Sequence, residues 1–102
     1  MRQFPEEVRR EMGYAIYLAQ NGSKHPDTKP LKGFGGAGVL EVVERFDGNA
    51  YRTIYTVNLA GAVYVLHAFQ KKSKRGIATP QHDLNLVRER LRRAQEHHDR
   101  NK

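Results

Sequence analysis

The sequence contains no cysteine and no tryptophan among its 102 residues. The absence of thiols excludes disulfides, zinc–thiolate sites and cysteine-based catalysis. Ser23 and Ser73 are the only serines, and neither lies in the glycine-flanked turn that hydrolases use for a serine nucleophile. No HExxH motif is present, and apart from the adjacent pair His97 and His98 the histidines are scattered. The sequence therefore predicts no metal site and no cofactor.

Long hydrophobic runs are also missing. No apolar run approaches the roughly 20 residues that a membrane-spanning helix needs. The N-terminal stretch MRQFPEEVRREM lacks the apolar region of a secretory signal. We therefore expect a cytoplasmic protein without a membrane contact, folded as one domain over residues 1–102.

Acidic residues are scarce relative to basic ones. Eighteen Lys and Arg face eleven Asp and Glu, which leaves a net charge of +7 and a pI near 10.0. A polyanion is the partner that such a charge favours, because phosphate neutralisation releases condensed counterions. A solvated basic surface with no specific partner is the alternative.

A helix is predicted at each end of the chain. In residues 5–21, Pro5 and two glutamates begin a pattern of apolar residues at helical spacing. Gly13 in its interior predicts a close packing contact, since glycine otherwise costs helix stability. The second helix begins at Thr79–Pro80 and its apolar stripe ends at Ala94. Residues 95–102 are polar and are expected to fray.

Three strands are predicted between the helices, separated by turn signals. They are residues 39–46, 50–58 and 62–69, joined at Asp47–Gly48–Asn49 and at Ala60–Gly61. Short turns make them antiparallel neighbours, and the third strand is apolar on both faces, which favours a central or doubly covered position. Residues 22–38, rich in glycine, are expected to form a loop with a basic rim that includes Lys29 and Lys32. The class predicted is α+β.

The second and third strands carry the residues of chemical interest. Arg52, in the middle of an apolar and aromatic strand, needs either an anionic partner or access to solvent. That partner is either Glu41 or Glu44 in a cross-strand ion pair, or a substrate. His67 and Tyr55 taken alone are more often core residues than catalytic ones.

Cations gather where the third strand ends. Lys71, Lys72, Lys74 and Arg75 follow it directly, within reach of Arg52 and His67 if the pairing is antiparallel. Such a run is most often a solvated loop. Fixed cations at one point, together with a proton acceptor, are also what RNA cleavage requires.

Several blocks of the chain resemble one toxin family. FPEEVRREMGYAIYLAQNG, KPLKGFGGAGVLEVVE, YRTIYTV and VYVLHAFQKKSKRGIATP are similar to the phage-derived HigB-like branch of the RelE/HigB superfamily. The resemblance implies a small RelE-like α+β domain, a twisted antiparallel sheet with an N-terminal and a C-terminal helix packed on it. It also implies a metal-independent endoribonuclease that cleaves mRNA on the translating ribosome and is neutralised by a cognate antitoxin, commonly of the helix-turn-helix type.

The resemblance also implies roles for individual residues. Arg52 would stabilise the phosphate, and Lys71 and Lys72 would hold RNA and take part in proton transfer. His67 and Tyr55 complete the candidate catalytic set. The RNA-binding candidates are Lys29, Lys32, Lys74 and Arg75.

The sequence departs from the family pattern in two places. Members usually have a further strand ahead of the first helix, and residues 1–4 show no pattern for one, so we expect an exposed strand edge open to a second copy or an antitoxin. Basic residues that some relatives carry on the first strand after the loop are replaced by Glu41, Val42 and Val43. A catalytically silent relative that binds RNA or an antitoxin is the alternative function.

Overall fold

The computed structural model describes residues 3–34, 38–59, 62–72 and 79–100. Within them, two helices and a four-stranded antiparallel sheet of order β1-β2-β3-β4 form one small α+β domain, which confirms the predicted class. The elements are α1 (Glu6–Gln20), β1 (Thr28–Pro30), β2 (Val39–Phe46), β3 (Asn49–Leu59), β4 (Ala62–Lys72) and α2 (Gln81–Arg100).

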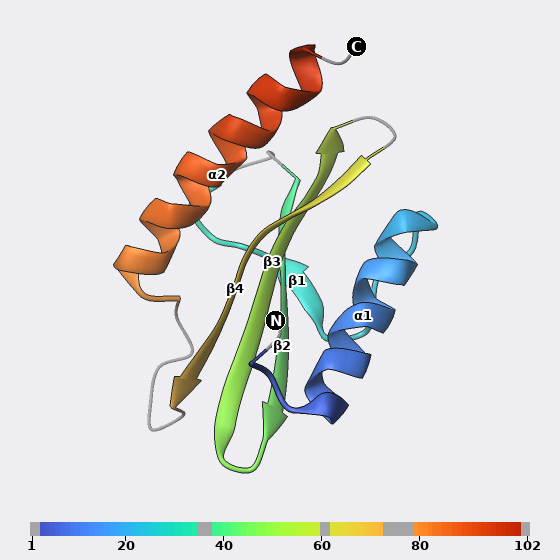
Figure 1. Cartoon of the computed structure of the whole chain (residues 1–102), viewed down its shortest axis with the longest axis vertical. Helices are drawn as coiled ribbons and strands as arrows, with labels where there is room; N and C mark the ends of the chain where they lie inside the picture. The colour runs from blue at the N-terminus through green and yellow to red at the C-terminus, as the bar shows by residue number, and fades with distance from the viewer. Residues whose placement is uncertain (1–2, 35–37, 60–61, 73–78, 101–102) are drawn as a thin grey trace.

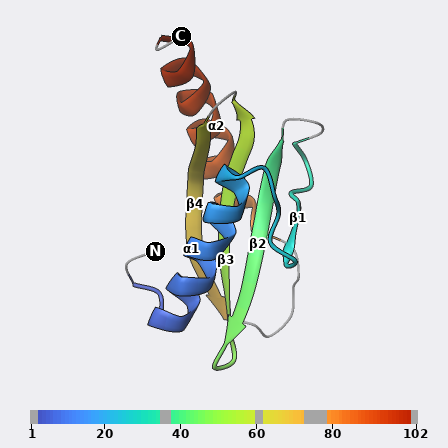
Figure 2. The ribbon, with the colours of Figure 1, turned by 90° about the vertical axis from the view of Figure 1, so that its right-hand side faces the viewer.

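The two helices lie on opposite faces of the sheet (Figures 1 and 2). Alternation along β3 divides its side chains between them. Tyr51 and Tyr55 pack with α1 residues such as Met12 in one hydrophobic cluster. Ile54 packs with Val87 of α2 in another. The protein thus has two small cores separated by the sheet.

Helix α1 follows the sequence prediction closely. It begins after Pro5, with Glu6 and Glu7 in its first turn, and ends where Asn21 caps the Tyr17 carbonyl with its side chain. The expected packing contact at Gly13 was wrong. Among the described residues, no atom beyond the neighbouring backbone of the helix itself lies within 4 Å of the position that a Cβ would occupy there, because Gly13 sits on the solvent face of the helix.

The hairpin between β2 and β3 has the predicted turn. Asp47 and Gly48 have φ angles of 52° and 78°, and left-handed φ at both central residues matches the twist of the flanking strands. Ala60 and Gly61, the other predicted turn, lie outside the described residues, although Leu59 pairs with Ala62 across it.

Strand β4 is an edge strand, so of its two predicted positions the central one is wrong and the doubly covered one is confirmed. Its apolar character on both faces reflects the two helices, since α1 and α2 both pack against it. The other edge is β1, three residues that pair with β2 inside the segment expected to be a loop. A register shift next to Ile54 and Tyr55 leaves Leu66 as an extra residue in β4.

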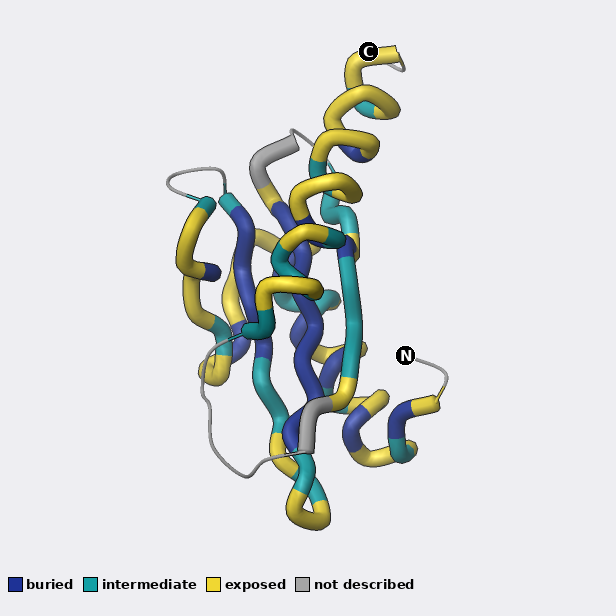
Figure 3. The backbone as a smooth tube through the Cα atoms, turned by 90° about the vertical axis from the view of Figure 1, so that its left-hand side faces the viewer, coloured by how far each residue is buried: buried dark blue, intermediate teal, exposed yellow. Residues whose placement is uncertain are grey.

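Helix α2 continues to Arg100, beyond the predicted end at Ala94. Its last turns are exposed (Figure 3). The side chains of Arg92 and Glu96, which lie one turn apart, stabilise this part of the helix by an ion pair at 2.8 Å. The ring of His97 also lies edge-on to Tyr64, with centroids 6.2 Å apart. Neither described helix is long and apolar enough to cross a membrane.

Candidate nucleic-acid interface

Arg52 is buried in an ion pair under α2. Its guanidinium donates to Glu41 Oε2 over 3.0 Å, and both side chains are 2% exposed. Glu41 Oε2 also accepts a 2.6 Å hydrogen bond from the Thr79 hydroxyl. Of the two partners considered for Arg52, the structure selects Glu41, the residue of β2 that faces the same side of the sheet. The network connects β2, β3 and the segment in front of α2.

Lys29 and Lys32 lie at the rim of this network. Lys29 Nζ is 3.9 Å from Glu41 Oε1 and remains mostly exposed. Both lysines line a cavity of about 210 Å³ together with Glu41, Thr79 and Leu84. Two of the predicted RNA-binding residues are therefore neighbours of the Arg52 network, on its solvent side.

His67 stands one step along the same face, opposite Ile54 in the β3–β4 register. Its Nε2 lies 2.7 Å from Asp83 Oδ1, and its Nδ1 lies 2.8 Å from Arg90 Nη1. The ring stacks on Phe69, with centroids 4.9 Å apart. Histidine, aspartate and arginine thus form one chain of contacts from α2 to β4.

These contacts determine which ring nitrogen of His67 carries the proton. A guanidinium can only donate, so Nδ1 must be the unprotonated acceptor. The proton then resides on Nε2 and is donated to Asp83. Asp83 fixes the tautomer and the ring orientation, which are the two requirements for a histidine that later accepts a proton at Nδ1.

The Nδ1 side of His67 opens toward solvent. A shallow depression of about 380 Å³ is lined by His67, Arg90 and the neighbouring β4 residues Val65, Leu66 and Ala68. Arg90 is exposed and also donates to the Leu66 carbonyl over 3.0 Å. That carbonyl belongs to the extra residue of β4, so the bulge creates the second anchor of Arg90.

Tyr55 lies on the other side of the sheet from His67 and Arg52. It is fully buried in the α1 cluster, and burial raises the pKa of its hydroxyl. Because the sheet separates it from the other candidates, Tyr55 does not share a site with them.

The cations after β4 are described only in part. Lys71 and Lys72 end the strand, paired with Ala50 and Asn49 in β3. This register places Lys71 near Arg52 in the sheet, since Arg52 pairs with Phe69. Lys74 and Arg75 lie outside the described residues.

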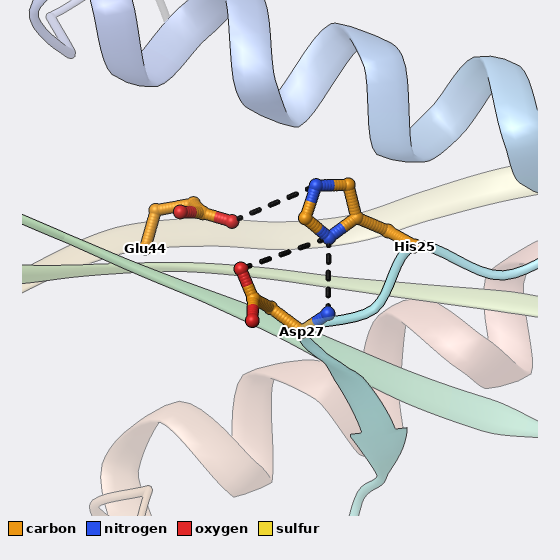
Figure 4. Close-up of side chains that lie close together, drawn as sticks. All are labelled: His25, Asp27 and Glu44. Atoms are coloured by element: carbon orange, nitrogen blue, oxygen red, sulfur yellow. Dashed lines mark hydrogen bonds and ion pairs between the residues drawn. The ribbon is translucent and has the colours of Figure 1, made fainter.

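A second polar cluster surrounds His25 under α1. His25, Asp27 and Glu44 bring their ligand atoms within 4.8 Å of one another (Figure 4), and Glu11 Oε1 lies 3.3 Å from His25 Nε2. These are residue types that bind metals. However, the Asp27 amide donates to His25 Nδ1 over 3.0 Å, which places the ring proton on Nε2 and leaves no nitrogen lone pair for a metal.

The sequence reasoning missed Asp83 and Arg90 as partners of His67. Both residues follow the spacing of the buried positions Val87 and Ala94, so charged residues at 83 and 90 on that stripe could have signalled a polar contact with the sheet.

Comparison with known families gives one match. The family model described as phage-derived protein Gp49-like (DUF891) matches residues 1–92, which include every element except the end of α2. No curated protein and no solved structure matches the chain.

Proposed function

Because the chain belongs to the Gp49-like family of phage-derived proteins, we propose that it is a type II toxin of the HigB-like kind that cleaves mRNA. The family is a RelE/toxin-like group. The net charge of +7 suits an RNA partner. The proposed partners are mRNA on the translating ribosome and a cognate antitoxin of the helix-turn-helix type.

The observation that carries the proposal is the oriented histidine in an open depression. His67 holds its proton on Nε2 against Asp83, and its Nδ1 faces an exposed arginine. An RNA phosphate is a stronger partner for a guanidinium than a neutral imidazole nitrogen is. Arg90 would therefore turn to the phosphate and free Nδ1 to act as a base.

The proposed cleavage uses no metal. His67 Nδ1 takes the proton of a 2′-hydroxyl, the 2′-oxygen attacks the adjacent phosphorus, and the bond from phosphorus to the 5′-oxygen breaks. A 2′,3′-cyclic phosphate is left, and Lys71 or Lys72 delivers a proton to the 5′-oxygen. Asp83 stabilises the imidazolium, and Arg90 stabilises the charge that gathers on the phosphate.

Arg52 has a different part in this proposal. With an exposed fraction of 2% and a close bond to Glu41, it contacts RNA only if the segment at Thr79 moves aside. In the described arrangement it positions β2, β3 and the start of α2 relative to one another. Lys29 and Lys32, exposed beside it, are the proposed RNA contacts of that region.

A catalytically silent relative is the second candidate, and one observation favours it. Both ring nitrogens of His67 are hydrogen-bonded and Arg52 is paired with Glu41. Such a network would also serve a purely structural purpose, holding α2 on β4. RNA or an antitoxin would then bind the basic face without cleavage.

Induced expression in a bacterium separates the two candidates. The wild type should arrest growth and fragment mRNA, and His67→Gln should do neither. His82→Gln, an exposed histidine on the same helix as Asp83, is the matched control and should behave as the wild type. Thermal unfolding of the purified variants verifies that they are folded. Intact mRNA after wild-type induction would favour the silent relative.

A further inference from the structure

The His25 cluster contains more carboxylates than its cations can balance. Glu11 comes from α1, Asp27 from the segment before β1, and Glu44 from β2, and all three face His25. His25 is 6% exposed. The ring accepts the Asp27 amide at Nδ1, and its charge lowers the pKa of Glu44 less than burial and Asp27 raise it. The ring of Tyr14 also lies in a T-shaped contact with His25 and brings no charge to the cluster.

Asp27 and Glu44 bring carboxylate oxygens within 4.8 Å of each other, and repulsion between two ionised carboxylates at this distance favours a proton on one of them. A carboxylate cannot donate to another carboxylate, so only a protonated member can supply a hydrogen bond between them. Oε1 of Glu44 is buried and has no hydrogen-bond partner in the described part of the chain. One proton on the pair converts the repulsion into a hydrogen bond, as in other paired carboxylates.

We infer that Asp27 and Glu44 share one proton at weakly acidic pH, and that this proton clasps the segment in front of β1 to β2. The clasp has a structural consequence, because Asp27 directly precedes β1. Strand β1 carries Lys29, which lines the cavity beside Glu41. When the proton leaves, the repulsion between Asp27 and Glu44 should loosen β1 and this cavity wall.

The sign of the pH effect follows from the direction of the shift. Burial, and then the hydrogen bond and charge of Asp27, raise the pKa of Glu44 from 4.5 to about 7. The folded protein therefore holds a proton that the unfolded chain releases near pH 4.5. This stabilisation is complete below pH 4.5 and is lost as the pH rises through about 7.

The wild-type protein provides the direct test. Carbon-13 NMR of the side-chain carboxyls should show one group, Glu44 or its partner Asp27, that titrates near pH 7. The unfolding equilibrium constant should rise by about tenfold or more between pH 5 and pH 8, since each unit of pKa difference corresponds to a factor of ten. If Glu44 and Asp27 both titrate below pH 5, the inference is wrong.

A variant distinguishes the effect of the shared proton from the effect of pH on the other ionisable groups. Glu44→Gln keeps the shape and supplies a permanent donor to Asp27, so the rise between pH 5 and pH 8 should largely disappear. Glu7→Gln, the same change at an exposed site on α1, should keep the wild-type profile. An unchanged profile in Glu44→Gln would contradict the clasp. So would a Zn²⁺-dependent stabilisation of the wild type that Glu44→Gln abolishes, because it would identify a metal site instead.

Discussion

Glu41 and Glu44 lie in the same strand, three residues apart, and have opposite surroundings. Glu41, under α2, meets the Arg52 guanidinium, the Thr79 hydroxyl and the ammonium of Lys29. Glu44, under α1, meets the carboxylates of Asp27 and Glu11 and the imidazole of His25. The first carboxylate is 2% exposed and paired with its counterion, whereas the second is 18% exposed among other carboxylates, where we infer that it holds a proton. Burial alone does not determine the charge of a group, because its partners do.

Removing the counterion of Glu41 should have the largest effect on stability. Arg52→Ala leaves a carboxylate that is 2% exposed without its guanidinium, and breaking a buried pair in this way typically costs about 3–5 kcal/mol. Urea unfolding measures the loss. The double variant Arg52→Met with Glu41→Leu should recover most of it, because no buried charge remains. Equal losses in the single and double variants would show that packing, rather than the ion pair, dominates.

Removing the neutral donor of the same network should have a smaller effect. Thr79→Val keeps the side-chain shape but deletes the hydrogen bond to Glu41 Oε2. Hydrogen bonds to charged groups are typically worth about 1.5–3 kcal/mol, so we expect a loss in that range by urea unfolding. The exposed Gln81→Ala, just after Thr79, removes only a solvent-exposed hydrogen bond to Asn85, so it should change stability little.

The His25 cluster lies on the other face of the sheet. Removing a negative charge from it should change the pH at which the protein loses stability. The charge of Glu11 contributes to the raised pKa of Glu44, so Glu11→Gln should lower that pKa. The fall in stability should then occur at a lower pH than in the wild type. Melting temperatures measured from pH 4 to pH 9 give the position of this fall. A shift to higher pH would contradict the assignment of Glu11.

The smallest change in stability is expected for a substitution outside both polar clusters, which serves as a reference. Gly13→Ala in α1 should stabilise the protein by roughly 0.5–1 kcal/mol, because alanine is the better helix former and the site is open. Its pH profile should match that of the wild type. Destabilisation would mean that Gly13 has a packing contact after all.

The sequence predicted the helices and strands better than it predicted their positions in the fold. Helical spacing located α1 and the start of α2, and Asp47–Gly48 located the hairpin, because these signals are local. The order of the strands is not local. The apolar residues on both faces of β4 left a central or a doubly covered position open, and the structure selects the second: β4 lies at the edge with a helix on each side.

The candidate site was predictable in part for the same reason. Arg52 needed an anion, and Glu41 was one of two candidates, but only the fold brings Thr79 to the pair. His67 was chosen for its chemistry, whereas Asp83 and Arg90 come from a helix whose position on the sheet no short-range pattern specifies. The His25 cluster was invisible because its four residues come from three separate parts of the chain.

Mapping the ends of cleaved RNA tests the central claim most directly. Purified ribosomes carrying a defined mRNA should be incubated with the wild type, His67→Gln, Arg90→Ala and the control His82→Gln. The account predicts fragments with 2′,3′-cyclic phosphate ends for the wild type and His82→Gln. His67→Gln should give at least about a hundredfold less, the usual contribution of a general base, and Arg90→Ala should be similarly impaired. Undiminished cleavage by a folded His67→Gln protein, with or without ribosomes, would contradict the account.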